Sequence, residues 1–222
     1  MTDVATAEED GAAEPRTVAE KRREQIVNAA VRLFSERGYF QTTIEDVASA
    51  VPISKGLIYR YFKDKNDLLY FALRYVLEKF EFEEIQQLLE KSGPLYTLIR
   101  LLNQHCEMAR THTLEVLLAY KSTKDLFPEQ RRYIKVLESK TARVIQQCLE
   151  ACIHNGLMTR INTDIMAYQF IMYGHSWALK NWAFRDRYSP EEYMAEGEKI
   201  LIYPFLTEAG RQEYAKIHSA TV

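Results

Sequence analysis

Amino, hydroxyl and phenol groups follow one another in one short polar stretch of the chain. Ser54, Lys55, Tyr59, Tyr61 and Lys65 stand there at intervals of one to four residues. A lysine amino group can bind guanine or a phosphate, and serine and tyrosine hydroxyls suit phosphate oxygens. Residue types at this spacing therefore indicate binding to a nucleic acid.

Catalytic and metal chemistry find little support elsewhere in the chain. The Gly-x-Ser-x-Gly nucleophile elbow, the P-loop and the dinucleotide fingerprint are absent. Cys148 and Cys152 share one helix face, but His154 points elsewhere on that helix, so buried thiols are favoured over metal ligands. We therefore expect no catalytic residue, no metal and no cofactor.

Local capping signals place the polar stretch among short helices. A first helix is expected over 18–37 and ends at Gly38. Thr42 or Thr43, each followed three residues later by an acid, can cap a second helix. That helix ends about two residues before Pro52, because the residue before a proline avoids helical geometry.

Two further helices complete this N-terminal unit. Ser54 can cap a third helix that reaches about residue 62, and a fourth begins at residue 65 or 66. The apolar spacing of the fourth helix persists to about residue 89. A capped helix, a tight break and a second short helix are typical of a helix-turn-helix, which lays one helix in the major groove of DNA.

The rest of the chain has helical periodicity and no convincing strand, so we predict an all-α fold. Gly93-Pro94 and Ser189-Pro190 are strong helix boundaries. The expected helices cover 94–110, 113–126, 128–154, 163–184, 189–206 and 208–217.

The charges divide the 222 residues into three parts. Residues 1–15 carry five acids and no base, while 16–80 carry twelve bases and eight acids, within a whole chain of net charge -2. A basic module joined to a near-neutral one suits a DNA-binding unit on a helical body. We expect a disordered acidic tail over 1–17, a helix-turn-helix domain over 18–80 and a helical domain over 81–222.

The sequence lacks the signals of membrane insertion and of secretion. It has no apolar run of about 18 residues, so we expect no membrane span. The N-terminus lacks the basic-then-apolar order of a signal peptide, which predicts a cytoplasmic protein. Three cysteines, an odd number, in a reducing compartment predict no disulfide.

The N-terminal unit resembles the DNA-binding domain of the tetracycline-repressor (TetR/AcrR) family. The residues that carry this resemblance are Arg23, Ile26, Ala29, Ala30, Leu33, Phe34, Gly38, Tyr39, Thr42, Thr43, Val47, Ala48, Ser54, Lys55, Gly56, Ile58, Tyr59, Tyr61, Phe62, Lys65, Leu68 and Leu69. They span about a quarter of the chain. The resemblance implies a homodimer that binds double-stranded DNA at a pseudo-palindromic operator and responds to a small effector.

The resemblance and the side-chain chemistry together imply a set of DNA-binding residues. These are Thr42, Thr43, Ser54, Lys55, Gly56, Leu57, Tyr59, Tyr61 and Lys65. Gly56 would let the DNA approach the backbone closely, and Leu57 could touch a thymine methyl. A basic arm at 21–23 precedes them. The alternative is that Tyr59, Tyr61 and Phe62 are core aromatics of a helical bundle.

Two positions depart from the family pattern. Pro52 stands where glycine usually serves a positive φ, which proline disfavours. Either the turn has another shape, or this position accepts a φ near the −65° that the proline ring prefers. Leu57 replaces a usual Thr or Ser, so no operator sequence can be carried over.

The helical body is expected to hold the effector. Its candidate lining residues are Met108, Leu117, Tyr120, Phe170, Tyr173 and Trp177. The segments 177–182 and 188–192 resemble family members that sense fatty acyl-CoA or other CoA thioesters, and nearby bases at 180, 185 and 187 could meet phosphates. Drugs or aromatic compounds are the alternative effectors, and core aromatics on a solvated basic face are the alternative interpretation of these residues.

The same body is expected to dimerise. The helices over 163–184 and 189–206 are apolar on several faces, so they need more than one packing partner, which a second subunit supplies. We therefore predict a ligand-responsive repressor. The rival interpretations are a helical small-molecule enzyme or carrier, and an architectural DNA binder without a ligand.

Overall fold

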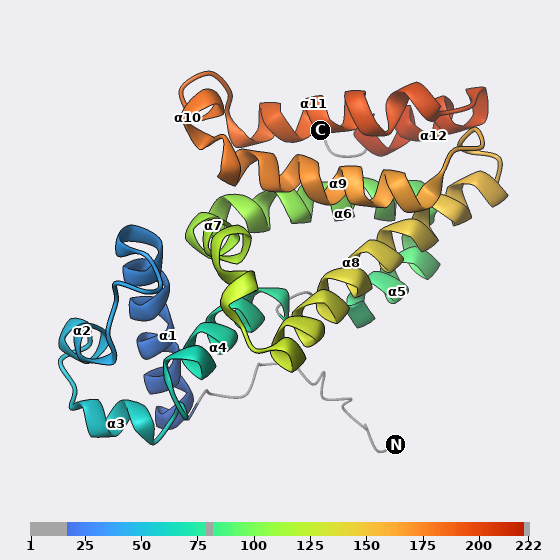
Figure 1. Ribbon diagram of the computed structural model, residues 1–222. Coiled ribbons are helices and arrows are strands. Elements are labelled where there is room, and N and C mark those ends of the chain that lie inside the picture. Colours follow the sequence, from blue (N-terminus) through green and yellow to red (C-terminus); the bar gives the residue numbers. More distant parts are fainter. Residues whose placement is uncertain (1–16, 79–81, 220–222) are drawn as a thin grey trace, which may run out of the picture.

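The computed structural model describes residues 17–78 and 82–219, and in this part of the chain the regular elements are all helical (Figure 1). The prediction of an all-α fold is confirmed. In chain order the elements are α1 (Val18–Arg37), α2 (Ile44–Ala50), α3 (Lys55–Tyr59), α4 (Lys65–Leu77), α5 (Phe82–Ser92), α6 (Pro94–Thr111), α7 (Thr113–Ser122), α8 (Pro128–His154), α9 (Thr163–Leu179), α10 (Asn181–Phe184), α11 (Pro190–Leu201) and α12 (Glu208–Ser219), with short 3-10 turns η1 (Thr123–Asp125) and η2 (Tyr203–Phe205).

Helices α1–α4 form a small unit that we call the head, at the lower left of Figure 1. A capping box between Thr17 and Glu20 starts α1, and Gly38 ends it at φ 94°. Thr17 is thus the cap of α1, one residue inside the expected tail; residues 1–16 lie outside the described part. The head closes around large buried side chains, among them Phe34 and Phe62.

The fourth helix is shorter than the sequence suggested. It ends at Leu77, and α5 starts at Phe82. The apolar spacing is shared between two helices, because Leu69 belongs to the hydrophobic cluster of the head while Ile85 belongs to that of the body. The expected domain boundary at 80 and 81 falls outside the described residues.

Helices α5–α12 form the body, in which α6, α8 and α9 pack side by side (Figure 1). The predicted span of α8 is confirmed at both ends. The expected helix over 163–184 is interrupted, because Lys180 leaves helical geometry at φ −123° and ψ 29° between α9 and α10. Helix α11 likewise stops at Leu201, and η2 follows.

Two contacts fix the packing inside the body. A Cβ on Gly174 of α9 would lie 2.6 Å from Cδ2 of His105 on α6, so only glycine permits this close crossing. Glu198 of α11 is buried and accepts hydrogen bonds from Asn103 Nδ2 (3.1 Å) and the Tyr214 hydroxyl (2.9 Å). Charge-assisted bonds of this kind join α12 and α11 to α6.

Head and body share one hydrophobic cluster. Leu118 of α7, Leu126 at the end of η1 and Ile134 of α8 belong to the same buried group as the core of the head. At the start of α4, Asn66 Nδ2 donates to the carbonyl of Asp125 at 2.8 Å. The head is therefore packed onto the body through both α1, which contacts α7, and α4, which contacts α7 and α8.

The turn between α2 and α3 keeps a positive φ in spite of its proline. Pro52 has φ 23°, far from the −65° that its ring favours. Of the two alternatives for this turn, the position does not adopt φ near −65°. The surrounding turn holds this geometry, since the amides of Val51 and Ile53 both donate to the carbonyl of Ala48.

We predict that Pro52→Gly stabilises the protein. Glycine accepts the positive φ, and relief of strain outweighs the extra freedom of the unfolded chain by about 1 kcal/mol. Urea unfolding measures the change. Pro94→Gly, at the first turn of α6, is the control and should lower stability. Loss of stability in Pro52→Gly would contradict the assignment of strain to this turn.

Candidate nucleic-acid interface and ligand cavity

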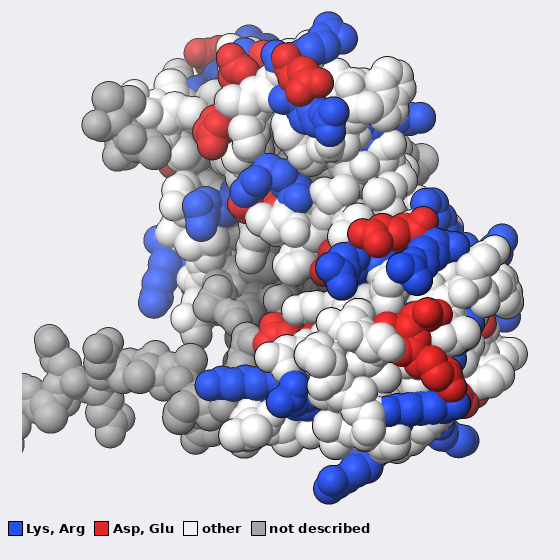
Figure 2. Space-filling model, turned by 90° about the vertical axis from the view of Figure 1, so that its left-hand side faces the viewer, with Lys and Arg blue, Asp and Glu red and all other residues white. Residues whose placement is uncertain are grey.

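Most residues of helix α3 are exposed to solvent. The Ser54 side chain caps it by accepting from the Leu57 amide at 3.2 Å, as predicted. Ile58 anchors it in the core, while Lys55 and Gly56 face solvent. Figure 2 shows Lys and Arg side chains along the lower edge of the molecule, the end at which α3 lies in Figure 1. This end can therefore meet a polyanion.

Gly56 has no structural reason to be glycine within the described protein. It lies in α3 with open space around it, and the nearest atom to an added Cβ would be Ser54 Oγ at 4.0 Å. Glycine weakens a helix, so its presence at an exposed position requires another explanation. Close approach of an external molecule to this backbone supplies one.

Lys55 is held by an acid in the free protein. Its amino group forms an ion pair with Glu45 of α2. The hydrogen bond between them raises the pKa of Lys55 and lowers the pKa of Glu45. A phosphate or a guanine that binds Lys55 would compete with this exposed ion pair.

The other predicted interface residues differ in accessibility. Tyr59 is 47% exposed, and its hydroxyl is available. Tyr61 is half-buried and packs against the core of the head. Lys65 starts α4, where its amino group lies 3.3 Å from the Phe40 carbonyl and 4.4 Å from the Tyr39 ring centroid. Partial burial lowers the pKa of Lys65.

Of the two threonines before α2, only Thr43 is exposed. It forms the capping box with Asp46, accepting from the Asp46 amide at 3.1 Å. Thr42 is 0% exposed, and its hydroxyl donates to the carbonyls of Leu33 and Gly38. The prediction of a DNA contact for Thr42 is therefore wrong, because its hydroxyl is buried and engaged.

The predicted basic arm belongs to the first turns of α1. Lys21 and Arg22 lie on the surface or at its edge, but Arg23 turns inward. Its guanidinium lies 3.9 Å from the ring centroid of Phe71 on α4. Arg23 thus stabilises the head by a cation–π contact.

The body contains a cavity of about 400 Å³, which we call the chamber. Helices α4, α6, α7, α8 and α9, together with η1, surround it. Its lining residues are Leu73, Leu77, Met108, Glu115, Val116, Ala119, Tyr120, Thr123, Ile134, Glu138, Tyr168, Ile171, Met172 and His175. This volume and mostly apolar wall suit a small organic molecule.

The polar side chains of the chamber wall are Glu115, Tyr120, Thr123, Glu138, Tyr168 and His175. The Tyr120 hydroxyl lies 3.0 Å from His175 Nδ1 and donates to Met172 Sδ at 3.2 Å. Burial lowers the pKa of His175 to about 4, so its ring is neutral at pH 7. Burial also raises the pKa of Glu138. The chamber can orient a neutral polar group against an apolar wall.

The predicted effector-binding residues divide into two groups. Met108 and Tyr120 line the chamber. Tyr173 does not, because its hydroxyl and that of Tyr193 each donate to the other's carbonyl and their rings stack at 4.6 Å. Phe170 and Trp177 are buried in the body core.

Leu117, the remaining prediction, is half-buried on α7 outside the chamber. Leu117, Phe170, Tyr173 and Trp177 thus lie outside the chamber, and their role as effector contacts stays a prediction. Sequence reasoning missed the chamber face of α9, whose members are Tyr168, Ile171, Met172 and His175. Their spacing of three and four residues marks one helix face.

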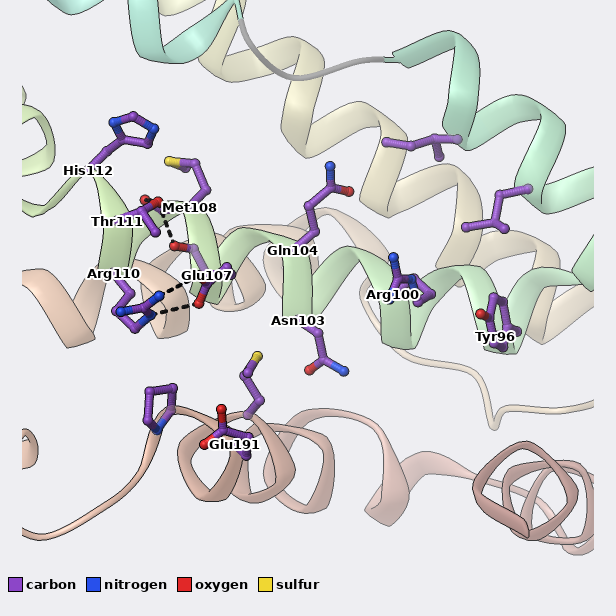
Figure 3. Close-up of a pocket in the computed structure, with 14 residues that line it drawn as sticks. Tyr96, Arg100, Asn103, Gln104, Glu107, Met108, Arg110, Thr111, His112 and Glu191 are labelled. Carbon is purple, nitrogen blue, oxygen red and sulfur yellow. Dashed lines mark hydrogen bonds and ion pairs between the residues drawn. The ribbon is translucent and has the colours of Figure 1, made fainter. Parts of the chain in front are cut away.

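A second hollow, which we call the trough, runs along α6 with a volume of about 890 Å³ (Figure 3). Its lining residues are Ile85, Leu88, Tyr96, Arg100, Asn103, Gln104, Glu107, Met108, Arg110, Thr111, His112, Pro190, Glu191 and Met194. In Figure 3, Asn103 and Arg110 point toward α11, whereas Gln104, Met108 and His112 lie on the opposite side of α6. The trough is more polar than the chamber.

Residues 17–78 and 82–219 hold no group of three or more acids, histidines or cysteines placed to bind a metal. None of the helices in this part of the chain is both long and apolar enough to cross a bilayer. Cys106, Cys148 and Cys152 are buried free thiols, and burial raises the pKa of each to about 12.

Comparison with known sequences agrees with this geometry. The family described as "Bacterial regulatory proteins, tetR family" matches residues 26–70, which include α2, α3 and most of α1. The HTH-type transcriptional regulator HbdR of Aromatoleum sp. (strain CIB) is 41% identical over 204 residues. That alignment covers 92% of this chain and 89% of HbdR.

Solved structures share the fold. The TetR family regulator PfmR from Thermus thermophilus superposes with a TM-score of 0.70 at 22% identity, over 85% of this chain and 97% of PfmR. AibR, crystallised in complex with isovaleryl coenzyme A and operator DNA, gives a TM-score of 0.71 at 22% identity. The AibR match covers 83% of this chain and 100% of AibR.

We predict opposite effects of Gly56→Ala on stability and on DNA binding. Alanine should stabilise α3 by about 0.5–1 kcal/mol, because its Cβ enters open space. The same Cβ should lower operator affinity by at least about tenfold through a clash with DNA. Thermal unfolding and fluorescence anisotropy with an operator duplex measure the two effects. Unchanged DNA affinity would show that the DNA does not approach this backbone.

Removing the acid that holds Lys55 should strengthen DNA binding. Glu45→Gln frees the Lys55 amino group and removes a negative charge near phosphates, so affinity should rise about threefold to tenfold, most at low salt. Anisotropy titrations at two salt concentrations measure this. Glu208→Gln on α12 changes the same charge far from α3 and serves as the matched control. Equal gains in both variants would point to net charge alone.

Proposed function

This chain belongs to the tetR family of bacterial regulatory proteins and is a DNA-binding transcriptional regulator, not an enzyme; from this premise we propose that it is a dimeric repressor. A small effector with an apolar part, delivered as a CoA thioester, releases it from its operator. We retain the division into a DNA-binding head over 18–80 and an effector-binding body over 81–222, and a cytoplasmic location.

The observation that carries the proposal for the head is the exposed, capped α3 with open space at Gly56. The short helix can enter a major groove with Lys55, Gly56 and Leu57 first, and these side chains would meet base edges. Thr43, Ser54, Tyr59, Tyr61 and Lys65 would bind phosphates around it. Thr42 is left out of this set.

Dimerisation follows from the exposed apolar residues of the body. Ile165 on α9 is 58% exposed, and Ile200 on α11 is 55% exposed. A second subunit that covers α9 and α11 would bury such residues and place two α3 helices on a two-fold axis. Half-sites about 34–36 Å apart would then be read together.

Release from DNA would act through α4. Leu73 and Leu77 of this helix line the chamber, and Leu73 also belongs to the core of the head. At its end, Glu78 accepts from Arg74 Nε at 2.5 Å and from the Tyr133 hydroxyl of α8 at 3.2 Å. A ligand that moves this wall would therefore move the head.

Such a ligand must bind the state that cannot hold DNA more tightly than the state that can, or it shifts nothing. The chamber could hold a short acyl chain or an aromatic ring, because its volume is suitable and its wall is mostly apolar. The AibR complex with isovaleryl coenzyme A and operator DNA shows a protein of the same fold with such a ligand. This supports a CoA thioester over a free drug-like compound.

Operator binding tests the proposal directly. DNA from upstream of the protein's own gene is compared with a scrambled duplex at fixed physiological salt, with and without isovaleryl-, benzoyl- and octanoyl-CoA. Selective binding that one thioester abolishes is the expected result. Release of the operator by free benzoate or by hydrophobic drugs, but by no thioester, would contradict the proposed effector class. It would still support the assignment as a repressor.

We predict that Ala119→Leu blocks the effector without harming DNA binding. Ala119 is half-buried at the chamber wall. A larger side chain there fills part of the cavity and should lower the affinity for the effector by about tenfold. Ala215→Leu on the exposed face of α12 is the matched control. Effector titrations of the operator complex give the midpoint for each variant. An unchanged midpoint in Ala119→Leu would exclude the chamber as the effector site.

A further inference from the structure

We infer that the chamber and the trough are two compartments of one ligand site, and that the trough receives the polar, phosphate-bearing arm of the thioester. This inference rests on the proposed function, since it assigns the second half of the proposed effector. The acyl group would occupy the chamber, and the amide-containing arm would run outward along α6 to Arg100.

The wall between the two compartments is one side chain thick. Met108 lines both the chamber and the trough. Beside it, His112 of the trough and Glu115 of the chamber lie in contact, with Nδ1 and Oε1 3.3 Å apart. Methionine is unbranched and flexible, so a rotamer change at Met108 can join the two spaces without moving a helix.

The side-chain amides of Asn103 and Gln104 line the trough. Asn103 donates through Nδ2 to Glu198, but its Oδ1 is buried and has no hydrogen-bond partner among the described residues. Asn103 points toward α11, on the side of α6 opposite to Met108 (Figure 3). An arm that enters past Met108 would therefore meet the amide of Gln104, which lies on the same side of α6 as Met108. The arm of a CoA thioester contains two amides.

The charges of the trough place the phosphates at its outer end. Arg110 forms an ion pair with Glu107, in which its Nε lies 2.7 Å from Oε2 and its Nη2 lies 2.5 Å from Oε1. Glu191 adds a further negative charge to the same part of the trough. Arg100 is exposed and makes no ion pair within the described residues. It stands eight residues from Met108, which is about 12 Å along a helix. A phosphate would therefore bind at Arg100 and not beside the acids.

The test compares a complete thioester with a truncated one. Isothermal titration calorimetry on the full-length protein first identifies which of isovaleryl-, benzoyl- and octanoyl-CoA binds most tightly. The N-acetylcysteamine thioester of the same acyl group then serves as a ligand that keeps the acyl part and lacks the phosphates. Arg100→Gln removes the proposed phosphate partner, Met108→Trp blocks the passage, and Arg143→Gln is the control on the exposed surface of α8.

The wild type should bind the CoA thioester at least about tenfold more tightly than the truncated one, as expected for charge-assisted bonds to a phosphate. Arg100→Gln should remove most of this preference and leave the affinity for the truncated ligand unchanged. Met108→Trp should weaken binding of the CoA thioester to the DNA-free protein, as measured by calorimetry. Arg143→Gln should match the wild type with both ligands.

Other results separate the inference from the function on which it rests. A thioester that releases the operator with equal potency in wild type, Arg100→Gln and Met108→Trp would overturn the two-compartment site and leave the repressor intact. An equal loss of affinity for both ligands in Arg100→Gln would also overturn the two-compartment site, because the substitution would then act on the structure and not on a phosphate contact. If none of the three thioesters binds, both the proposed effector class and the two-compartment site are refuted.

Discussion

Helix α4 must satisfy two hydrophobic environments with the same few turns, and the rest of the architecture depends on this constraint. Leu68 and Leu69 close the core of the head, while Leu73 reaches both that core and the chamber. Leu118 and Ile134 of the body complete the same cluster. Because interiors pack densely and deform little, the head cannot change its angle without repacking the wall of the cavity.

Helix α6 is the central helix of the body, as α4 is the helix that links the core of the head to the chamber. Its crossing with α9 is close because Gly174 leaves room for His105, and α6 contributes residues to the walls of both the chamber and the trough. A helix fixed this firmly is a stable partition, so the adjustable element between the compartments is a side chain, Met108. The same rigidity lets a small ligand act at a distance, since displaced contacts pass to α4 instead of being absorbed locally.

Much of the helical framework was predictable because its signals are local. Thr43 with Asp46, Ser54, and Ser189 followed by Pro190 each satisfy amides within one turn of their own helix. The predicted span of α8 agrees with the structure for the same reason. Thr42 and Thr43 look alike in sequence, however, and only the packing of the loop against α1 buries Thr42.

The sequence by itself determined the helix-turn-helix, the all-helical body and the resemblance to a family of regulators, because capping and apolar periodicity act between near neighbours. The tertiary structure alone decided which apolar residues face a cavity. Phe170, Tyr173 and Ile171 share one helix and similar hydrophobicity, yet only Ile171 lines the chamber. Periodicity marks a face as buried, but whether that face meets a neighbouring helix or an open space depends on how distant helices cross.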